Sequence, residues 1–448
     1  MSVLTNQSNL KTNAMNAFAK AGDLQKRILF TLFALIVFRF GTYIPLPGIS
    51  REVLADAFNP GQNGLLGMFD TFAGGALSRM TILALNIMPY ITASIIVQMA
   101  MSIVPALNAL KKEGAAGYRK MNQYMRYLTI VVAVFQSFGL AVFLEGMTSP
   151  SGASVVIMTS SFLFRLTTII SLLGGTLFVV WLGEQITSRG IGNGTSLIIG
   201  VGIIAELPSA LARTLALGKA HQISQVGLLV VALLAFVMIW IIVAVERAQR
   251  RIVIQYPKGM MGGRPLSSKN TYFPMKVNPA NVMPPIFASA LLAVVMTLIK
   301  FFGSDSTFGQ DLQSTFNAGT ALYLTIYAAL IVLFTFVYTS ISFNLTEKAE
   351  DLKRSGAFIA GIRPGKSTAA YLDYVMTRLL TIGAIYLVVL CIVPQILISE
   401  LSVPFYFGGT SLLIVVTVIM DTLTQIQSYL VAYQYEGLIK KAQLKGRF

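Results

Sequence analysis

Long apolar segments separated by short polar ones run along the whole chain. An apolar helix of about 20 residues crosses the hydrocarbon core of a bilayer, and the segments have about that length. We therefore predict ten transmembrane helices, near residues 28–44, 81–104, 127–144, 164–183, 195–217, 225–245, 282–302, 319–342, 374–398 and 409–433.

The composition agrees with a polytopic membrane protein. Of the 448 residues 55% are hydrophobic and only 12% are charged, whereas soluble domains carry about 25% charged residues. The one cysteine, Cys391, and the one histidine, His221, exclude an intramolecular disulfide and argue against a protein-ligated zinc or iron–sulfur centre. Residues 1–27 lack the pattern of a cleavable signal and predict a cytoplasmic tail.

Basic residues gather on one set of loops, which holds 26 of the 34 lysines and arginines. By the positive-inside rule these loops and both termini are cytoplasmic. Five spans fall in residues 28–217 and five in 218–433, followed by a cytoplasmic tail at 434–448. Equal halves with an odd number of spans must be oppositely oriented, as in inverted-repeat membrane proteins, although no strong sequence repeat supports this.

Two large cytoplasmic loops, at about 246–281 and 343–373, carry much of the net charge of +16. In the first loop two strand-like segments flank a glycine-rich turn; they read R-R-I-V-I-Q-Y and T-Y-F-P-M-K-V. This pattern predicts an ordered basic hairpin that docks something large and acidic. Alternatively, the basic face serves only orientation and contact with anionic lipid headgroups.

Few charges lie inside the spans. Arg39 is near the outer end of the first span, from where its side chain can reach the interface. Glu206 shares a helical face with Arg213, which favours pairing or exposure to water, and Asp421 is a candidate for a buried polar contact. A secondary transporter that uses Glu206 and Asp421 is the alternative function, but such charges do not cluster at one depth. A third hypothesis is that the chain is a membrane anchor for a cytoplasmic complex and has no pore.

Enzyme motifs are missing from the sequence. It contains neither H-E-x-x-H nor G-x-S-x-G, and G-I-G-N-G-T-S at 190–196 follows no strand and precedes no lysine. The glycine-rich segment therefore predicts a turn into the fifth span. We expect no catalytic residue.

A short segment between the first two spans, at 67–80, reads G-M-F-D-T-F-A-G-G-A-L-S-R-M. Its apolar residues have helical spacing, but it is too short to cross a bilayer. A pair of glycines and two charges interrupt it, and the charge count places it on the outer side.

Several motifs resemble the bacterial SecY family, the central subunit of the Sec protein-conducting channel. They read L-A-L-N-I-M-P-Y-I-T-A-S-I-I-V-Q-M (83–99), W-L-G-E-Q-I-T-S-R-G-I-G-N-G (181–194), E-R-A-Q-R-R-I-V (246–253), G-I-R-P-G (361–365) and P-F-Y-F-G-G-T-S-L-L-I-V-V (404–416). The resemblance implies an all-α membrane protein with ten transmembrane helices in two inverted five-helix halves. These would surround an hourglass pore with a plug helix at about 64–80 and a lateral gate between spans 2–3 and 7–8. It would be a channel for secretory chains that releases hydrophobic segments into lipid, and not an enzyme.

The resemblance also assigns residues. The pore ring would be Ile87, Ile91, Ile199, Ile286 and Ile414, with Thr195 adjacent. The plug would include Met68, Phe69, Asp70, Phe72, Gly74, Gly75 and Arg79. The lateral gate would include Asn86, Gln98 and Asn281, and the docking site for the ATPase SecA or the ribosome Arg247, Arg250, Arg251 and Arg363.

The implied setting is the bacterial cytoplasmic (inner) membrane. The implied partners are the SecE and SecG subunits, SecA, the ribosome, anionic lipids and substrates with signal sequences; no cofactor is implied. Asn86 and Asn281 stand where the family usually has glycine. Either the two asparagines hydrogen-bond at the closed gate, or each faces water in the cytoplasmic funnel.

Overall fold

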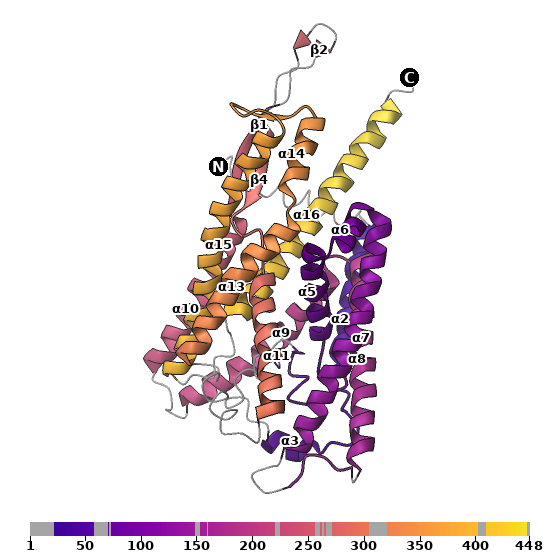
Figure 1. The fold of residues 1–448 in the computed structure, drawn as a ribbon, viewed down its shortest axis with the longest axis vertical. Helices are drawn as coiled ribbons and strands as arrows, with labels where there is room; N and C mark the ends of the chain where they lie inside the picture. Colours follow the sequence, from indigo (N-terminus) through magenta and orange to yellow (C-terminus); the bar gives the residue numbers. More distant parts are fainter. Residues whose placement is uncertain are drawn as a thin grey trace. The chain divides into compact units, whose positions relative to one another are not determined.

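A computed structural model of the chain describes residues 22–57, 70, 73–147, 153–158, 160–219, 225–255, 260–261, 264–265, 271–303, 320–401 and 409–445. The fold is helical with a small sheet (Figure 1). The helices are α2 (Gly22–Gly41), α3 (Arg51–Ala57), α5 (Met88–Ile103), α6 (Pro105–Lys112), α7 (Ala115–Glu145), α8 (Ser161–Arg189), α9 (Gly194–Lys219), α10 (Gln225–Arg247), α11 (Met283–Gly303), α13 (Ala321–Ser342), α14 (Leu345–Arg354), α15 (Lys366–Leu401) and α16 (Gly409–Lys445). The strands are β1 (Gln249–Gln255), β2 (Met260–Met261), β3 (Arg264–Pro265), β4 (Thr271–Lys276) and β5 (Phe358–Ile359).

A helix overlaps each of the ten predicted spans. In the described part of the chain six helical stretches are long and apolar enough to cross a membrane: Ala116–Glu145, Ser161–Arg189, Gly194–Ala216, Ala321–Arg354, Lys366–Ile396 and Gly409–Tyr433. Met88–Met101 and Met283–Leu292 are shorter apolar helices. The chain is therefore a multi-pass helical membrane protein. The second span was predicted from residue 81, but its helix begins at Met88.

The chain divides into two compact units, which we describe separately. The first contains residues 1–90, 126–211 and 414–448, and the second contains residues 91–125 and 212–413.

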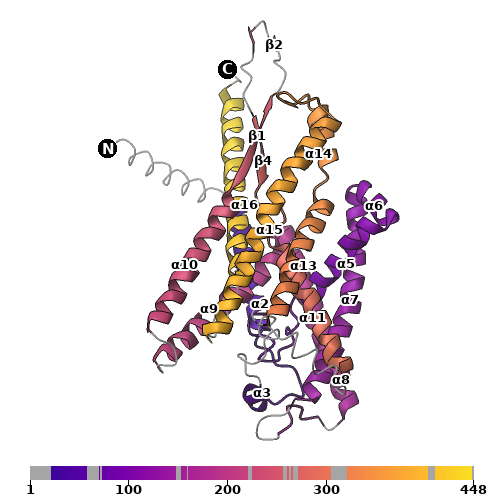
Figure 2. The ribbon, with the colours of Figure 1, turned by 60° about the vertical axis from the view of Figure 1, so that its left-hand side comes forward.

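In the first unit α7 and α8 lie side by side (Figures 1 and 2) and are joined by an ion pair at each end. The guanidinium of Arg126 binds both carboxylate oxygens of Glu184, at 2.9 and 2.6 Å. At the other end Arg165 Nη2 lies 2.6 Å from Glu145 Oε2. Arg126 and Glu145 are separated by 19 positions on α7, about 28 Å at the rise of an α-helix. This separation nearly equals the ~30 Å of a bilayer's hydrocarbon, as expected for ion pairs that lie at its two boundaries.

Residues 42–50 and 74–87 of the first unit are irregular, and they pair with each other. Leu46 N–H donates to Met80 O at 2.9 Å, and Ile82 N–H donates to Ile44 O at 3.0 Å. Apolar side chains of these segments join a core with α7 and α8 that includes Leu46, Leu77, Met80, Leu144, Phe164 and Leu172. The irregular backbone is thus satisfied by itself and covered by helices, as backbone at membrane depth requires.

In the second unit the basic loop forms the predicted hairpin. Strands β1 and β4 are antiparallel, from Gln249 opposite Lys276 to Ile254 opposite Thr271. Pro274 has no N–H to donate, and it sits on β4, at the edge of the sheet order β4-β1-β5, where this is tolerated. Strand β5 of the other large loop pairs with the opposite side of β1. The sheet packs through Ile252, Met275 and Ile359 against Leu372 and Met376 of α15.

The helices of the second unit pack through small and aromatic side chains. α11 packs on α13, and α13 packs on α15. The ring of Phe287 meets those of Phe334 and Tyr338 edge-on, with centroids 6.0 and 5.7 Å away. At the hairpin base Asn278 Nδ2 donates to the buried Glu246 Oε1 at 2.9 Å, which joins the end of α10 to the start of α11.

Adjacent glycines on α8 give a matched test of the packing between α8 and the segment at 74–87 in the first unit. A Cβ at Gly175 would overlap the carbonyl oxygen of Ile82, whereas a Cβ at Gly174 meets open space. We expect Gly175→Ala to destabilise the protein by about 1–3 kcal/mol through overpacking. Gly174→Ala should be neutral or stabilise the helix by up to about 1 kcal/mol. Thermal unfolding of the purified complex in detergent measures both, and equal melting temperatures would contradict the close approach.

Candidate functional site

The segment predicted as a plug is described at Asp70 and from Ala73 onward; Met68, Phe69 and Phe72 lie outside the described residues. Asp70 organises the part that is described. Its Oδ1 accepts from the backbone N–H groups of Leu77 at 3.0 Å and Ser78 at 2.8 Å, and its carbonyl accepts from Gly75 N–H. Burial raises the pKa of the Asp70 carboxyl, helped by the charge of Glu206 and opposed by the bonds from Ser78 and Leu77.

Both glycines of the segment have positive φ, 67° at Gly74 and 74° at Gly75, a conformation that costs L-residues about 1–2 kcal/mol. Both also lie against α9. A Cβ at Gly74 would be 2.9 Å from the Cα of Gly202, and a Cβ at Gly75 would overlap Glu206 Oε1. The absence of side chains thus lets this turn approach the backbone of α9.

Two arginines converge on the turn. Arg39 Nη1 donates to the carbonyl oxygen of Gly74 at 2.9 Å, and Arg79 Nη2 donates to the same oxygen at 2.7 Å. Both guanidiniums also lie over the ring of Tyr43, at 5.0 and 4.6 Å from its centroid. Arg39, which the sequence predicts to reach the interface, thus also has a specific acceptor in the carbonyl oxygen of Gly74.

Glu206 pairs with Arg79, at 3.8 Å between Oε1 and Nη2. The sequence suggested Arg213 as its partner, but the side chain of Arg213 lies outside what the structure describes. Ser209 Oγ donates to Glu206 Oε2 at 2.9 Å and fixes the carboxylate from its own helix. Sequence reasoning missed Gly202, Ser209 and Tyr43. The available signal was the spacing of Gly202, Glu206 and Ser209, which places a small residue, an acid and a hydroxyl on one face of α9.

The five ring candidates are all buried, with exposed fractions from 1% at Ile87 to 8% at Ile91 and Ile286. Each lies in the first two turns of a helix or just before it: Ile87 and Ile91 at α5, Ile199 on α9, Ile286 on α11 and Ile414 on α16. Ile87, Ile199 and Ile414 belong to the first unit, and Ile91 and Ile286 to the second. Thr195 binds Asn193 Oδ1 through both its N–H and its hydroxyl, at 3.1 and 2.5 Å, and so serves the start of α9.

Asn86 and Asn281, the gate candidates, share a left-handed backbone, with φ of 48° and 57°. Asn tolerates this conformation better than other residues with a side chain. Their occurrence where glycine is usual therefore has a local explanation in each unit. Gln98 is half-buried on α5. Whether the two asparagines are coupled stays a prediction.

Comparison with known proteins identifies the family. A family model described as SecY matches residues 81–423. A relative named protein translocase subunit SecY, from Haemophilus influenzae, is 48% identical over 95% of this chain and 96% of its own. The chain belongs to the SecY family.

Solved structures show that the fold is shared as well. A structure described as a protein conducting channel has a TM-score of 0.63 at 16% identity, over 92% of this chain and 93% of its own. Sec61 in a canine ribosome–channel complex has a TM-score of 0.61 at 14% identity, over the same shares. The chain therefore shares its fold with solved channel structures of much lower sequence identity.

The basic residues expected to dock partners of SecY lie on the sheet of the second unit and next to it. Arg250 and Arg251 are on β1, Arg247 ends α10, and all three are exposed. Arg363, also exposed, is in the turn between β5 and α15, where its carbonyl accepts from Thr368 Oγ1 at 3.0 Å. Since β5 pairs with β1, the structure brings arginines from both large loops to one small sheet.

Other sequence expectations concern α9 and α16. The segment at 190–194 is a turn between α8 and α9, as predicted, with Gly192 at φ 86° and its N–H bound to Gln425 Oε1 at 2.9 Å. Asp421 is half-buried on α16. Among the described residues no group of three or more His, Cys, Asp or Glu could hold a metal ion.

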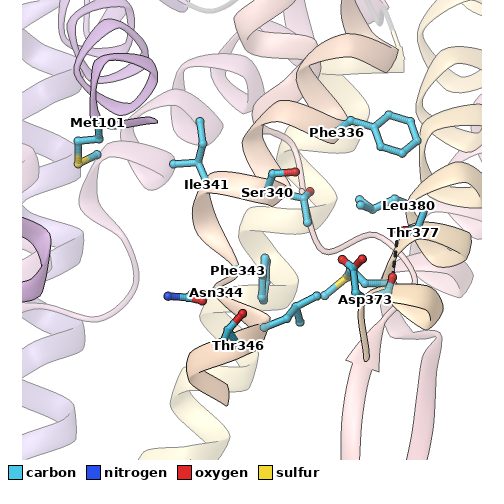
Figure 3. A pocket seen from close by; sticks show the side chains of 13 residues that line it. Met101, Phe336, Ser340, Ile341, Phe343, Asn344, Thr346, Asp373, Thr377 and Leu380 are labelled. Carbon is cyan, nitrogen blue, oxygen red and sulfur yellow. Dashed lines mark hydrogen bonds between the residues drawn. The ribbon is translucent and has the colours of Figure 1, made fainter. Parts of the chain in front are cut away.

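The second unit also has an open cavity of about 530 Å³ at the junction of α13, α14 and α15, reached by Met101 of α5 (Figure 3). Two of its polar side chains serve local structure. Asn344 Oδ1 accepts from Glu347 N–H and caps α14, and Thr377 Oγ1 donates to the carbonyl of Asp373. These contacts fit a junction between helices, and we assign no ligand to it.

The positive φ of Asn86 gives a test that uses two substitutions at one position. Asn86→Gly should leave the melting temperature of the detergent-purified complex unchanged or raise it, because glycine accepts this φ freely. Asn86→Ala should be about 1 kcal/mol less stable than Asn86→Gly, because alanine has a Cβ and lacks the tolerance of asparagine for a left-handed backbone. An alanine variant as stable as the glycine variant would contradict the backbone explanation.

Proposed function

We propose that this chain forms the channel through which unfolded secretory polypeptides cross the membrane and from which hydrophobic segments leave sideways into the bilayer. The observation that carries this is its 48% identity, over nearly the whole chain, to a protein translocase subunit. The family transports proteins and is not an enzyme family. This membership, and the engagement of Glu206 with Arg79, set aside a transporter based on Glu206 and Asp421.

In this proposal ten spans form two inverted five-helix halves, residues 28–217 and 218–433, around an hourglass pore. The overlap of a helix with every predicted span supports it. So does the spacing of the ion pairs at the two ends of α7 and α8, which matches one bilayer.

Ile87, Ile91, Ile199, Ile286 and Ile414 would form the constriction. An apolar ring excludes ions because dewetting opposes their passage, while an extended polypeptide can push through. Aliphatic side chains form no strong hydrogen bonds with a passing chain, so they retain no particular sequence. The burial of all five side chains is compatible with such a role.

Exit through a lateral gate near Asn86, Gln98 and Asn281 would sort segments by partitioning. At the centre of a helix Leu, Ile, Phe or Val favours the membrane by about 0.3–0.6 kcal/mol, while Asp, Lys or Arg costs about 2.5–3.5 kcal/mol. Over a span these terms amount to several kcal/mol. A gate that exposes the chain to lipid therefore needs no chemistry of its own.

The segment at 67–80 would be the plug, a short helix in the outer funnel. Its tight turn at Gly74 and Gly75 and its contacts with α9 support this role. Asp70, Arg79 and their partners give it a polar side that lipid would not accept.

SecA or the ribosome would dock on four arginines, Arg247, Arg250, Arg251 and Arg363. These residues and both termini would lie on the cytoplasmic side. Contact with ribosomal RNA would be dominated by phosphates and sensitive to salt. SecE and SecG would complete the complex in the bacterial inner membrane, and anionic lipids would bind its basic face.

Deletion of residues 67–75 tests the plug. Export of a secretory protein should persist, because the ring remains, while ion conductance of the reconstituted complex should rise. Planar-bilayer recordings measure this. An unchanged conductance, with no other segment filling the funnel, would contradict the assignment.

A cysteine placed in the ring tests translocation itself. The native Cys391 is buried and is first replaced by serine. Cysteine at Ile286 should then crosslink to a cysteine in a stalled secretory chain, since the side chain would line the path. Failure at Ile286, Ile91 and Ile414 alike, in an assembled complex, would overturn the proposed pore.

A further inference from the structure

We propose that Arg79 and Glu206 form an ion-pair latch across Gly75, and that Glu206 is the residue of α9 that positions the plug in the closed channel. This rests on the proposed role of residues 67–80. The latch identifies the contacts that would retain the plug and places the start of the moving part at Gly75.

Both ends of the latch are anchored. Arg79 directly precedes the segment that pairs with residues 44–46, through the bond from Leu46 N–H to Met80 O and the bridge between Pro45 and Thr81. Glu206 is held by its own helix through Ser209, at 2.9 Å. The pair therefore joins two fixed parts of the first unit.

The glycine turn lies beneath this pair. A Cβ at Gly75 would overlap Glu206 Oε1 and lie 2.8 Å from Arg79 Nη2, so the two charged groups meet directly above its Cα. On the preceding residue, the carbonyl of Gly74 accepts from Arg79 and Arg39. Gly74 and Gly75 cannot leave α9 until these bonds break and the turn passes the pair.

The partner of Arg79 is specific. The other carboxylate of the segment, Asp70, is directed at the N–H groups of Leu77 and Ser78. It stabilises the fixed side of the turn and leaves Glu206 to pair with Arg79. Loss of the Glu206 charge should therefore not be replaced by Asp70.

The latch is strong enough to bias the plug and weak enough to release it. The side chains of Arg79 and Glu206 are 36% and 22% exposed, and partly exposed pairs of this kind contribute modestly. A passing polypeptide can therefore displace the plug, and the pair can form again afterwards. A fully buried pair would resist opening much more.

The test uses isosteric or near-isosteric changes in the complete complex: Glu206→Gln, Arg79→Gln and the double variant. Each is measured by ion leak in planar bilayers. A second readout is labelling of Ser78→Cys, in a Cys391→Ser background, by a membrane-impermeant maleimide added to the outer side. Ser78 is suited to this because its backbone N–H donates to the carboxylate of Asp70 at 2.8 Å. Movement of Asp70 away from this bond should expose residue 78 to the maleimide.

We expect each single variant to raise leak and labelling by about two- to fivefold, as for a partly exposed ion pair. The double variant should add little, since either change already breaks the pair. Glu184→Gln is the matched control, because it removes the ion pair with Arg126 in the same unit. This pair lies at the other end of α7 and α8 from Leu144 and Phe164, which pack with Leu77 and Met80. The control should leave both readouts unchanged.

Three results would overturn the latch. These are multiplicative effects in the double variant, an equal effect of Glu184→Gln, or wild-type leak in Glu206→Gln while deletion of 67–75 raises leak. The last result would leave the plug itself in place. If the deletion also left leak unchanged, the plug assignment would fail, and the latch with it.

Discussion

Backbone N–H and C=O groups at membrane depth have no water to bind, and this constraint governs the fold. Helices satisfy it over most of the chain. The irregular segments at 42–50 and 74–87 satisfy it by pairing with each other, through residues 44–46 and 80–82, and by lying against α7 and α8. Where Gly74 turns out of any regular pattern, two guanidiniums meet its carbonyl oxygen. Arg39 and Arg79 thus follow from the same requirement that makes the spans helical.

Close approach of backbones is the second consequence. Lipid tails are as apolar as leucine, so helices in a membrane associate by packing, and small residues at their contacts allow it. Gly175 against Ile82, Gly194 against Gly183 and Gly74 against Gly202 are such contacts within the first unit. Gly194 is the first residue of α9, and Ile199, proposed for the pore ring, lies in the first two turns of the same helix.

Features that depend on a local pattern could be predicted from the sequence. Features that depend on contacts with residues far away in the chain could not. The apolar spans, the β1–β4 hairpin and the turn at 190–194 could be predicted because length, alternation and glycines are read along the chain. The helical start of α5 could not: residues 81–87 are as apolar as the helix that follows, but Ile82 N–H donates to Ile44 O, and the N–H groups of Ala84 and Asn86 form local turns. Arg213 lies on the same helical face as Glu206, but its side chain is outside the described residues. The pair that the structure describes is with Arg79, 127 positions away, which no local pattern predicts.

If residues 67–80 are the proposed plug, their charged residues are better explained by reversibility than by stability. A plug held only by apolar side chains would gain as much by dissolving in lipid as by returning to its seat. Guanidiniums and carboxylates cannot do so cheaply, and among the described residues their partners lie on Tyr43, Gly74, Leu77, Ser78 and α9. A partly exposed ion pair such as Arg79–Glu206 costs little to break and re-forms without repacking a core. In the proposed channel it would therefore return the turn at Gly75 to one place after each passage.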